Sequence, residues 1–223
     1  MRLTPTAVAV AVVLCVTGAS CTSAPAPRIR LQPPLPALAA HVGAVPRDKI
    51  GPTHRPGCPV PVDRLRLIRM NHWGFDGEVH RGELVVHEQA VRPLLHVFGK
   101  AFEAKFPIRR MRVMAEYDGD DARAMADDNT SAYNCRRVTG APALLSRHAY
   151  GDAVDINTVE NPYVDGRGAV HPPAGRRHLR RDRPVPGMIR EGDVLTTAFR
   201  QVGWHWGGRW SNPDYQHFSA NGD

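Results

Sequence analysis

Apolar residues recur at strand and helix spacings along the second quarter of the chain. Residues 64–70 and 83–87 have the composition of β-strands, and the Asp-Gly pair between them is a turn sequence. Residues 91–102 place Val, Leu and Phe at the spacing of one helix face. This pattern predicts a β-hairpin followed by a helix that ends before Pro107.

The later part of the chain predicts a second helix and two short strands. Residues 194–202 repeat the helical spacing and are followed by Gly203, a common C-terminal cap. Residues 109–114 and 215–219 have strand composition. Residues 163–187 form a long loop rich in Pro, Gly and Arg, and loops of such length are usually functional or mobile. The order of elements predicts an α+β fold, a small antiparallel sheet with flanking helices.

The N-terminus has the features of an export signal. Residues 1–20 contain one Arg, an apolar run from Ala7 to Val16 and small residues just before Cys21. The run is too short to span a membrane, so it predicts a secretory signal peptide. Small residues before a cysteine resemble a bacterial lipoprotein signal, although Gly18 stands where Leu is usual. We expect an exported protein, either lipidated at Cys21 on the outer face of the cytoplasmic membrane or cleaved and secreted to the cell wall.

A proline-rich stretch separates this signal from the rest of the chain. Residues 21–55 have little apolar periodicity, which predicts an extended tether without a core of its own. Residues 56–223 fit one domain of ordinary size. With the other two cysteines assigned to the signal region, Cys58 and Cys135 remain in this domain. They form either a disulfide, which is plausible outside the cytoplasm, or two free thiols.

The positive charge of the chain limits its partners. The net charge is +7, and much of it comes from arginines in the tether and in residues 176–190. For an exported protein, such a basic surface suits the anionic cell wall, and a merely solvated loop is the alternative. We expect no nucleic-acid partner, because aromatic residues do not alternate with these arginines. We expect a monomer whose only membrane contact is the lipid anchor.

Two histidines and two aspartates have the composition of a catalytic zinc site. His148, Asp155 and His217 supply three ligands and leave the fourth position open. Asp214 lies three residues before the last ligand and is the candidate for the general base that activates a metal-bound water. His148 and Asp155 cannot both reach one ion from a single regular strand or helix. A break at Gly151 resolves this, with His148 on a loop and Asp155 in a strand.

These residues resemble the motifs of the LAS zinc metallopeptidases, which include lysostaphin-type endopeptidases, D-Ala-D-Ala carboxypeptidases and the zinc domain of hedgehog proteins. The pattern S-x-H-x-x-G-x-A-x-D plus D-x-x-H is met by Ser146, His148, Gly151, Ala153, Asp155, Asp214 and His217. Residues 206–210 and 129–136 are similar to segments of the VanY-like branch, which also contains L-Ala–D-Glu peptidases. Ser219 departs from the pattern, because many relatives have Glu there, and this affects a peripheral contact.

The resemblance implies a hedgehog/D-Ala-D-Ala peptidase-like fold around a single zinc ion and an activity on peptidoglycan stem peptides. By the same resemblance, Arg136 stabilises the developing oxyanion or holds a substrate carboxylate, with Arg137 as the alternative. Ser146 and Trp206 are candidates for substrate contacts. A plain turn residue is an equally good interpretation of Ser146, and a core position, where most aromatic residues lie, is the alternative for Trp206. A D-Ala-D-Ala carboxypeptidase is the first interpretation; an L-Ala–D-Glu endopeptidase and a non-catalytic hedgehog-like zinc domain are the alternatives.

Overall fold

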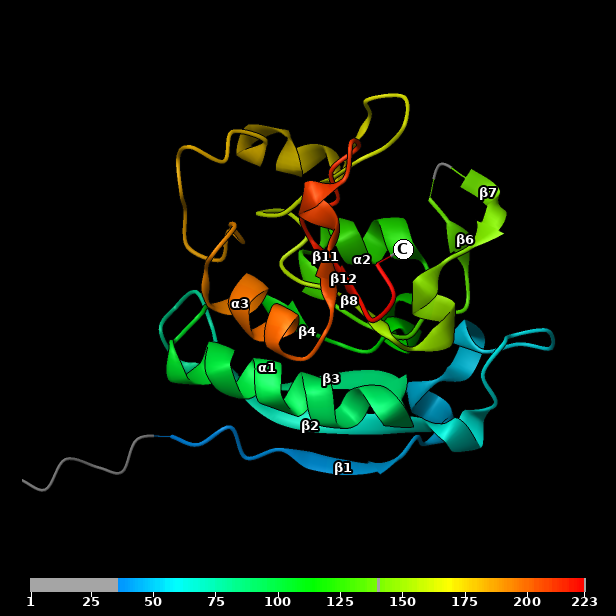
Figure 1. Ribbon diagram of the computed structural model, residues 1–223. Coiled ribbons are helices and arrows are strands. Elements are labelled where there is room, and N and C mark those ends of the chain that lie inside the picture. The colour runs from blue at the N-terminus through cyan, green and yellow to red at the C-terminus, as the bar shows by residue number, and fades with distance from the viewer. Residues whose placement is uncertain (1–35, 140, 223) are drawn as a thin grey trace, which may run out of the picture. The chain divides into compact units, whose positions relative to one another are not determined.

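The computed structural model describes residues 36–139 and 141–222 and shows an α+β fold (Figure 1), as predicted. The predicted signal peptide and Cys21 lie outside these residues. The helices are α1 (Val91–Glu103), α2 (Asp121–Ala126) and α3 (Val194–Gln201). The strands are β1 (His41–Ala44), β2 (Leu65–Trp73), β3 (Val79–His87), β4 (Arg110–Met111), β5 (Asn129–Thr130), β6 (Arg137–Val138), β7 (Ala141–Leu145), β8 (Ala153–Asp155), β9 (Tyr163–Val164), β10 (Val170–His171), β11 (His205–Trp206) and β12 (His217–Ser219). Within the described part of the chain, no helix has the length and apolar character needed to cross a bilayer.

β2 and β3 form the long hairpin that the apolar pattern predicted (Figure 1). Their antiparallel register pairs Ile68 with Leu84 and Leu67 with Val85. Because neighbouring residues of a strand face opposite sides, the first pair points into one apolar cluster and the second pair into another. Both faces of the hairpin are therefore buried, and it serves as the scaffold of the domain.

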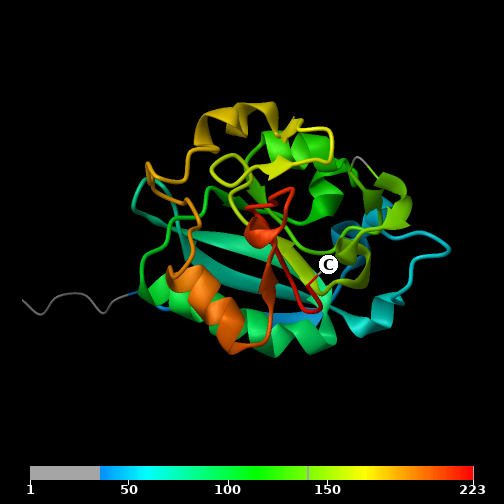
Figure 2. The same cartoon turned by 45° about the horizontal axis from the view of Figure 1, so that its top comes forward.

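α1 covers one face of this hairpin, as the helical spacing predicted. Leu94, Phe98 and Ala101 recur three or four residues apart, so they lie on one side of the helix and are buried in the cluster that contains Ile68. α3 packs beside α1 in both views (Figures 1 and 2) and adds Phe199 to the same cluster. These helices therefore close the larger apolar core.

The proline-rich stretch is not a tether over its described part. β1 pairs antiparallel with β2, with Val42 opposite Ile68, and Thr53 is buried. The prediction of a coreless tether over residues 21–55 is therefore wrong for residues 36–55, which belong to the compact unit. The physical reason is that β2 leaves an open edge, and backbone hydrogen bonds from β1 satisfy it without requiring an apolar pattern.

The strand predicted at residues 109–114 is shorter in the structure. β4 covers only Arg110–Met111, where it pairs in parallel with β5, and a 3-10 helix follows at Met114–Tyr117. Because β5 is itself only two residues long, it offers β4 no further ladder hydrogen bonds. Sequence composition alone does not reveal the length of the partner strand.

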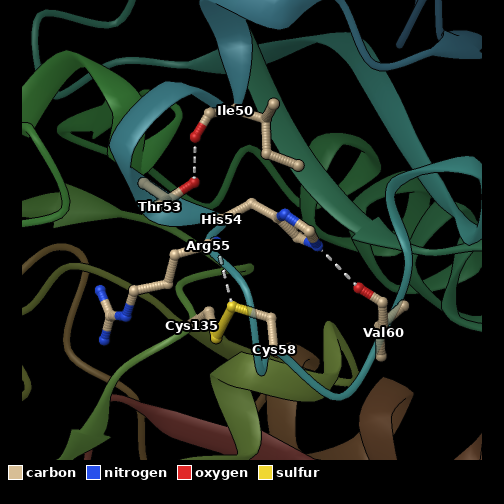
Figure 3. The surroundings of a disulfide bond; sticks show 7 residues. All are labelled: Ile50, Thr53, His54, Arg55, Cys58, Val60 and Cys135. Atoms are coloured by element: carbon tan, nitrogen blue, oxygen red, sulfur yellow. Dashed lines mark hydrogen bonds between the residues drawn. A yellow bond between two sulfur atoms is a disulfide. The ribbon is translucent and has the colours of Figure 1, made fainter.

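A disulfide joins Cys58 to Cys135 in the structure (Figure 3). The same region is held by backbone groups: the amide of Cys135 donates to the carbonyl of Thr53 at 3.1 Å, and the amide of Arg55 donates to Cys58 Sγ at 3.3 Å. The bond therefore ties the loop before β2 to the segment that leads into Arg136.

Replacing both cysteines is expected to lower the free energy of unfolding by about 4–5 kcal/mol, because the bond closes a loop of 77 positions in the unfolded chain. Urea unfolding of the wild-type protein and of the Cys58→Ala/Cys135→Ala variant measures the difference. Mass analysis of the purified protein without reductant should yield the two linked peptides. Recovery of both residues as free thiols would contradict the pairing.

The long loop between the two ligand motifs is folded rather than extended. β9 and β10 form a hairpin within it, and a 3-10 helix follows at Pro173–His178. The guanidinium of Arg181 donates to the Glu160 carbonyl at 2.7 Å and to the Asn161 side-chain oxygen at 2.8 Å, and it stacks on Tyr215 at 4.4 Å. Arg181 therefore holds the loop to the body of the domain. The other arginines between residues 176 and 183 are exposed: Arg176, Arg177, Arg180 and Arg183.

Candidate active site

A small central sheet, in the order β11–β12–β8, carries two of the three predicted metal ligands. The antiparallel register places His217 directly opposite Asp155. His148 comes from the 3-10 helix Arg147–Tyr150, which ends at Gly151 with a left-handed φ of 71°. A side chain at Gly151 would also meet the amide nitrogen of His87 at 2.6 Å. Gly151 is therefore the break that lets His148 turn toward the strand, as the sequence predicted.

The three side chains converge on one point. His148 Nε2 lies 3.1 Å from Oδ2 of Asp155 and 3.2 Å from Nδ1 of His217. His217 Nδ1 lies 3.0 Å from Oδ1 of Asp155, and all three residues are buried. The other ring nitrogen of His148, Nδ1, donates to the Ala132 carbonyl at 2.6 Å. This bond fixes the tautomer that leaves the lone pair of Nε2 facing Asp155 and His217.

The electrostatics of the triad are dominated by the pairing of its carboxylate with its imidazoles. Burial alone would raise the pKa of Asp155, but the two imidazoles beside it hold that pKa well below its usual range. Burial alone would lower the pKa of His148, but the Asp155 carboxylate outweighs it and keeps the pKa above its ordinary value. Each group is therefore stabilised by an opposite charge at the centre.

Zinc fits this arrangement. Ligand atoms that bind a tetrahedral zinc at about 2.0–2.2 Å lie about 3.3 Å from one another. The three facing atoms are within 4.8 Å of one another and supply two imidazole nitrogens and one carboxylate oxygen. A donor set of two histidines and one carboxylate is that of a catalytic zinc site with its fourth position open.

Asp214 lies beside the triad without joining it. It is half-buried at the wall of the pocket, and its Oδ1 has no hydrogen-bond partner among the residues that the structure describes. Its amide donates to the Gly207 carbonyl at 3.0 Å, and a side chain at Gly207 would come within 2.8 Å of the Asp214 carbonyl oxygen. Burial and the nearby Asp155 charge raise the pKa of Asp214 to about 7. Such a carboxyl group can accept and release a proton near neutral pH.

The three candidate ligands and Asp214 line a cavity of about 500 Å³. Arg136 lines this cavity, where its Nη2 lies 2.9 Å from Asp121 and its Nη1 donates to the Arg137 carbonyl at 3.0 Å. Asp121 also accepts a hydrogen bond from Thr139 at 3.1 Å. Arg136 therefore borders the cavity, and its guanidinium is held there by a carboxylate that partly neutralises its charge.

The other candidate substrate residues differ in position. Ser146 lines the cavity, and its Oγ accepts a hydrogen bond from the His148 amide at 3.3 Å, so it caps the 3-10 helix. Arg137 does not line the cavity; its guanidinium donates to the Ala143 carbonyl of the same hairpin at 3.3 Å. The sequence had offered Arg137 as the alternative to Arg136, and the geometry favours Arg136.

The prediction that Trp206 contacts the substrate is wrong, because its side chain faces away from the cavity. β11 pairs Trp206 with Phe218, so both side chains project to the face opposite His217. The indole of Trp206 donates to the Tyr215 carbonyl at 2.9 Å and packs against the core. Trp210 lines the cavity instead, with its ring 5.5 Å from that of His217. The strand register that separates these tryptophans is not visible in the sequence.

Several lining residues were not singled out from the sequence. Asp121, Tyr163 and Gln216 all border the cavity. Gln216 directly precedes a ligand within the D-x-x-H motif, so its proximity could have been inferred from the motif alone. Asp121 and Tyr163 both lie outside the motifs. The length of the loop 163–187 marks the region of Tyr163 but not the residue itself, and no sequence signal marks Asp121.

Residues 139–220 match the family model described as D-alanyl-D-alanine carboxypeptidase. The matched segment is little more than a third of the chain, but it contains His148, Asp155, Asp214 and His217. Over this segment the match supports the resemblance to VanY-like zinc peptidases. Neither the curated proteins nor the solved structures gave a match to the chain.

Proposed function

We propose that this protein is an exported zinc peptidase that hydrolyses peptidoglycan stem peptides, with removal of a terminal D-Ala as its principal reaction. The observation that carries the proposal is the buried His148–Asp155–His217 group with Asp214 beside it in one cavity. The description of the matching family supports the choice of substrate. A purely binding domain is disfavoured, because it has no need of a carboxylate with a free oxygen next to the metal ligands.

The chain's own residues divide the hydrolysis between them. Zinc bound by the three ligands would supply Lewis-acid chemistry at the scissile carbonyl. Asp214 accepts a proton from the attacking water at a carboxylate oxygen and passes it to the leaving nitrogen as the carbon–nitrogen bond breaks. Arg136 pairs with a carboxylate of the substrate, and Asp121 holds its guanidinium in place.

An L-Ala–D-Glu endopeptidase is the second candidate, because the same metal site and base serve both reactions. Arg136, Arg137 and the arginines of residues 176–183 are the candidates for holding a free C-terminal carboxylate. Of these only Arg136 lines the cavity, and it is already paired with Asp121. The preference for the carboxypeptidase therefore rests on Arg136 and on the family description.

A pentapeptide ending in D-Ala-D-Ala is expected to be cleaved about 10- to 100-fold faster than its C-terminal amide, because a hydrogen bond between charged groups contributes about 1.5–3 kcal/mol. Mass analysis of the products from both peptides measures this ratio and identifies the bond that is cut. Equal cleavage of the two, or products divided between L-Ala and D-Glu, would favour the endopeptidase.

The same pair of peptides tests the role of Arg136. The double variant Arg136→Gln/Asp121→Asn removes both charges together and leaves neither one unpaired. It is expected to cleave the acid and the amide at similar rates. If it still prefers the acid, another group recognises the carboxylate.

A further inference from the structure

Tyr163 lies next to the proposed base, although it belongs to neither sequence motif. An isolated antiparallel bridge pairs Tyr163 with Asp214. On either side of the bridge, the Val164 amide donates to the Pro213 carbonyl at 2.9 Å, and the Tyr215 amide donates to the Pro162 carbonyl at 3.3 Å. Residues paired in this way project to the same side, with Cβ atoms about 4.5–5.5 Å apart. The phenol of Tyr163 therefore lies beside the Asp214 carboxyl group, at the wall of the cavity.

The ring of Tyr163 is held in place from behind. Tyr163 and His171 are opposite each other in the β9–β10 hairpin, and their rings stack with centroids 5.7 Å apart. His171 Nε2 in turn lies 3.0 Å from Oδ2 of Asp165. The other oxygen of Asp165 accepts hydrogen bonds from the amides of Arg167 and Ala169, each at 2.9 Å. The turn, the imidazole and the phenol form one supported unit, so little freedom remains to be lost when the hydroxyl meets a ligand.

The hydroxyl of Tyr163 is available as a neutral donor. Burial, followed by the charges of Asp214 and Asp165, raises the pKa of Tyr163, so the phenol keeps its proton at neutral pH. Two other donors at the cavity, Arg136 and Thr139, are already engaged within the protein, because both contact Asp121. A phenol beside a general base can reach the carbonyl oxygen of the same peptide bond on which the base acts.

We propose that Tyr163 is a catalytic residue whose hydroxyl donates a hydrogen bond to the scissile carbonyl oxygen as negative charge develops on it. The proton stays on Tyr163 throughout, and Asp214 alone transfers protons. This inference rests on the proposed peptidase function. It assigns to the long loop between the motifs a task in the reaction, that of presenting the phenol through the His171–Asp165 pair.

The test is Tyr163→Phe, which retains the ring and its stacking on His171 and deletes only the hydroxyl. We expect kcat/KM for the D-Ala-D-Ala peptide to fall by about 10²–10³-fold, the usual effect of removing one oxyanion donor. KM and bound zinc should stay close to those of the wild type. Tyr133→Phe is the matched control, because the Tyr133 hydroxyl is buried in the second core cluster, outside the cavity, with no hydrogen-bond partner among the described residues.

A second measurement separates a catalytic from a structural role. A phosphinate peptide, in which a tetrahedral phosphorus replaces the scissile carbonyl carbon, should bind Tyr163→Phe more weakly by the same factor by which kcat/KM falls. The affinity for the cleaved product should not change. His171→Ala, which removes the stacking partner, should lose part of the same rate, whereas His171→Phe, which restores an aromatic ring, should recover it.

Each result decides the inference. Activity of Tyr163→Phe within about threefold of the wild type, or a rise in KM at constant kcat, would overturn the role of Tyr163 while the peptidase function stands. A wild-type protein that neither cleaves the stem peptides nor binds the phosphinate would overturn the peptidase function and this inference together.

Discussion

Replacing Asp214 by Asn is expected to lower kcat by about 10²–10⁴-fold and to leave the zinc content unchanged. Asp214 lies outside the group of ligand atoms but borders the same cavity, and its Oδ1 has no partner in the described part of the chain. Asn keeps the shape of the side chain and removes its ability to accept a proton. The variant should therefore bind substrate normally and fail in the proton transfers. Steady-state kinetics on the pentapeptide and metal analysis of the same sample measure both properties.

Asp182→Asn is the control for this experiment, because it removes an exposed carboxylate whose partner, Arg180, is also exposed. Its kcat should equal that of the wild type. If Asp214→Asn instead releases the metal, Asp214 is a ligand, and the division of roles at the site must be revised. If Asp214→Asn keeps both metal and full activity, another group acts as the base.

Local patterns predicted the parts of the fold that local physics determines. The spacing of apolar residues identified α1 and α3, because one buried face is enough to define a helix. The β2–β3 hairpin was identified from two runs of strand composition with a turn sequence between them. The candidate ligands were equally accessible, since His148, Gly151 and Asp155 form one short motif in which residue type and spacing already restrict the chemistry.

Features that depend on the register between distant segments could not be predicted. Trp206 and Trp210 are the same residue type and lie four positions apart in sequence. The pairing of β11 with β12 turns Trp206 away from the cavity, whereas Trp210 lines it. β1 has no apolar pattern and was expected to be part of a tether, but it completes the edge of β2. Arg181 looked like one of several solvated arginines, and its contacts with Glu160 and Asn161 exist only in the folded loop.

Loss of any one metal ligand is expected to have the largest effect on this protein. The variants His148→Ala, Asp155→Ala and His217→Ala should each lose most of the zinc and reduce peptide hydrolysis to background, because a site with three protein ligands cannot spare one. Metal analysis of the purified variants and their rates on the pentapeptide check this directly. His80→Ala is the matched control, since His80 is an exposed histidine paired with Asp76 away from the cavity.

The same site links metal to folding. Zinc that binds only the folded chain stabilises it by about 4 kcal/mol when its free concentration is 1,000 times the dissociation constant. A chelator is therefore expected to lower the melting temperature of the wild type and of His80→Ala but not that of the three ligand variants. Unchanged zinc retention in all three variants would refute the assignment of the ligands. A metal held by His148, Asp155 and His217 makes the effect of the chelator depend on these residues. If the chelator instead lowers the melting temperature of the wild type and of the ligand variants equally, the stabilising metal lies elsewhere.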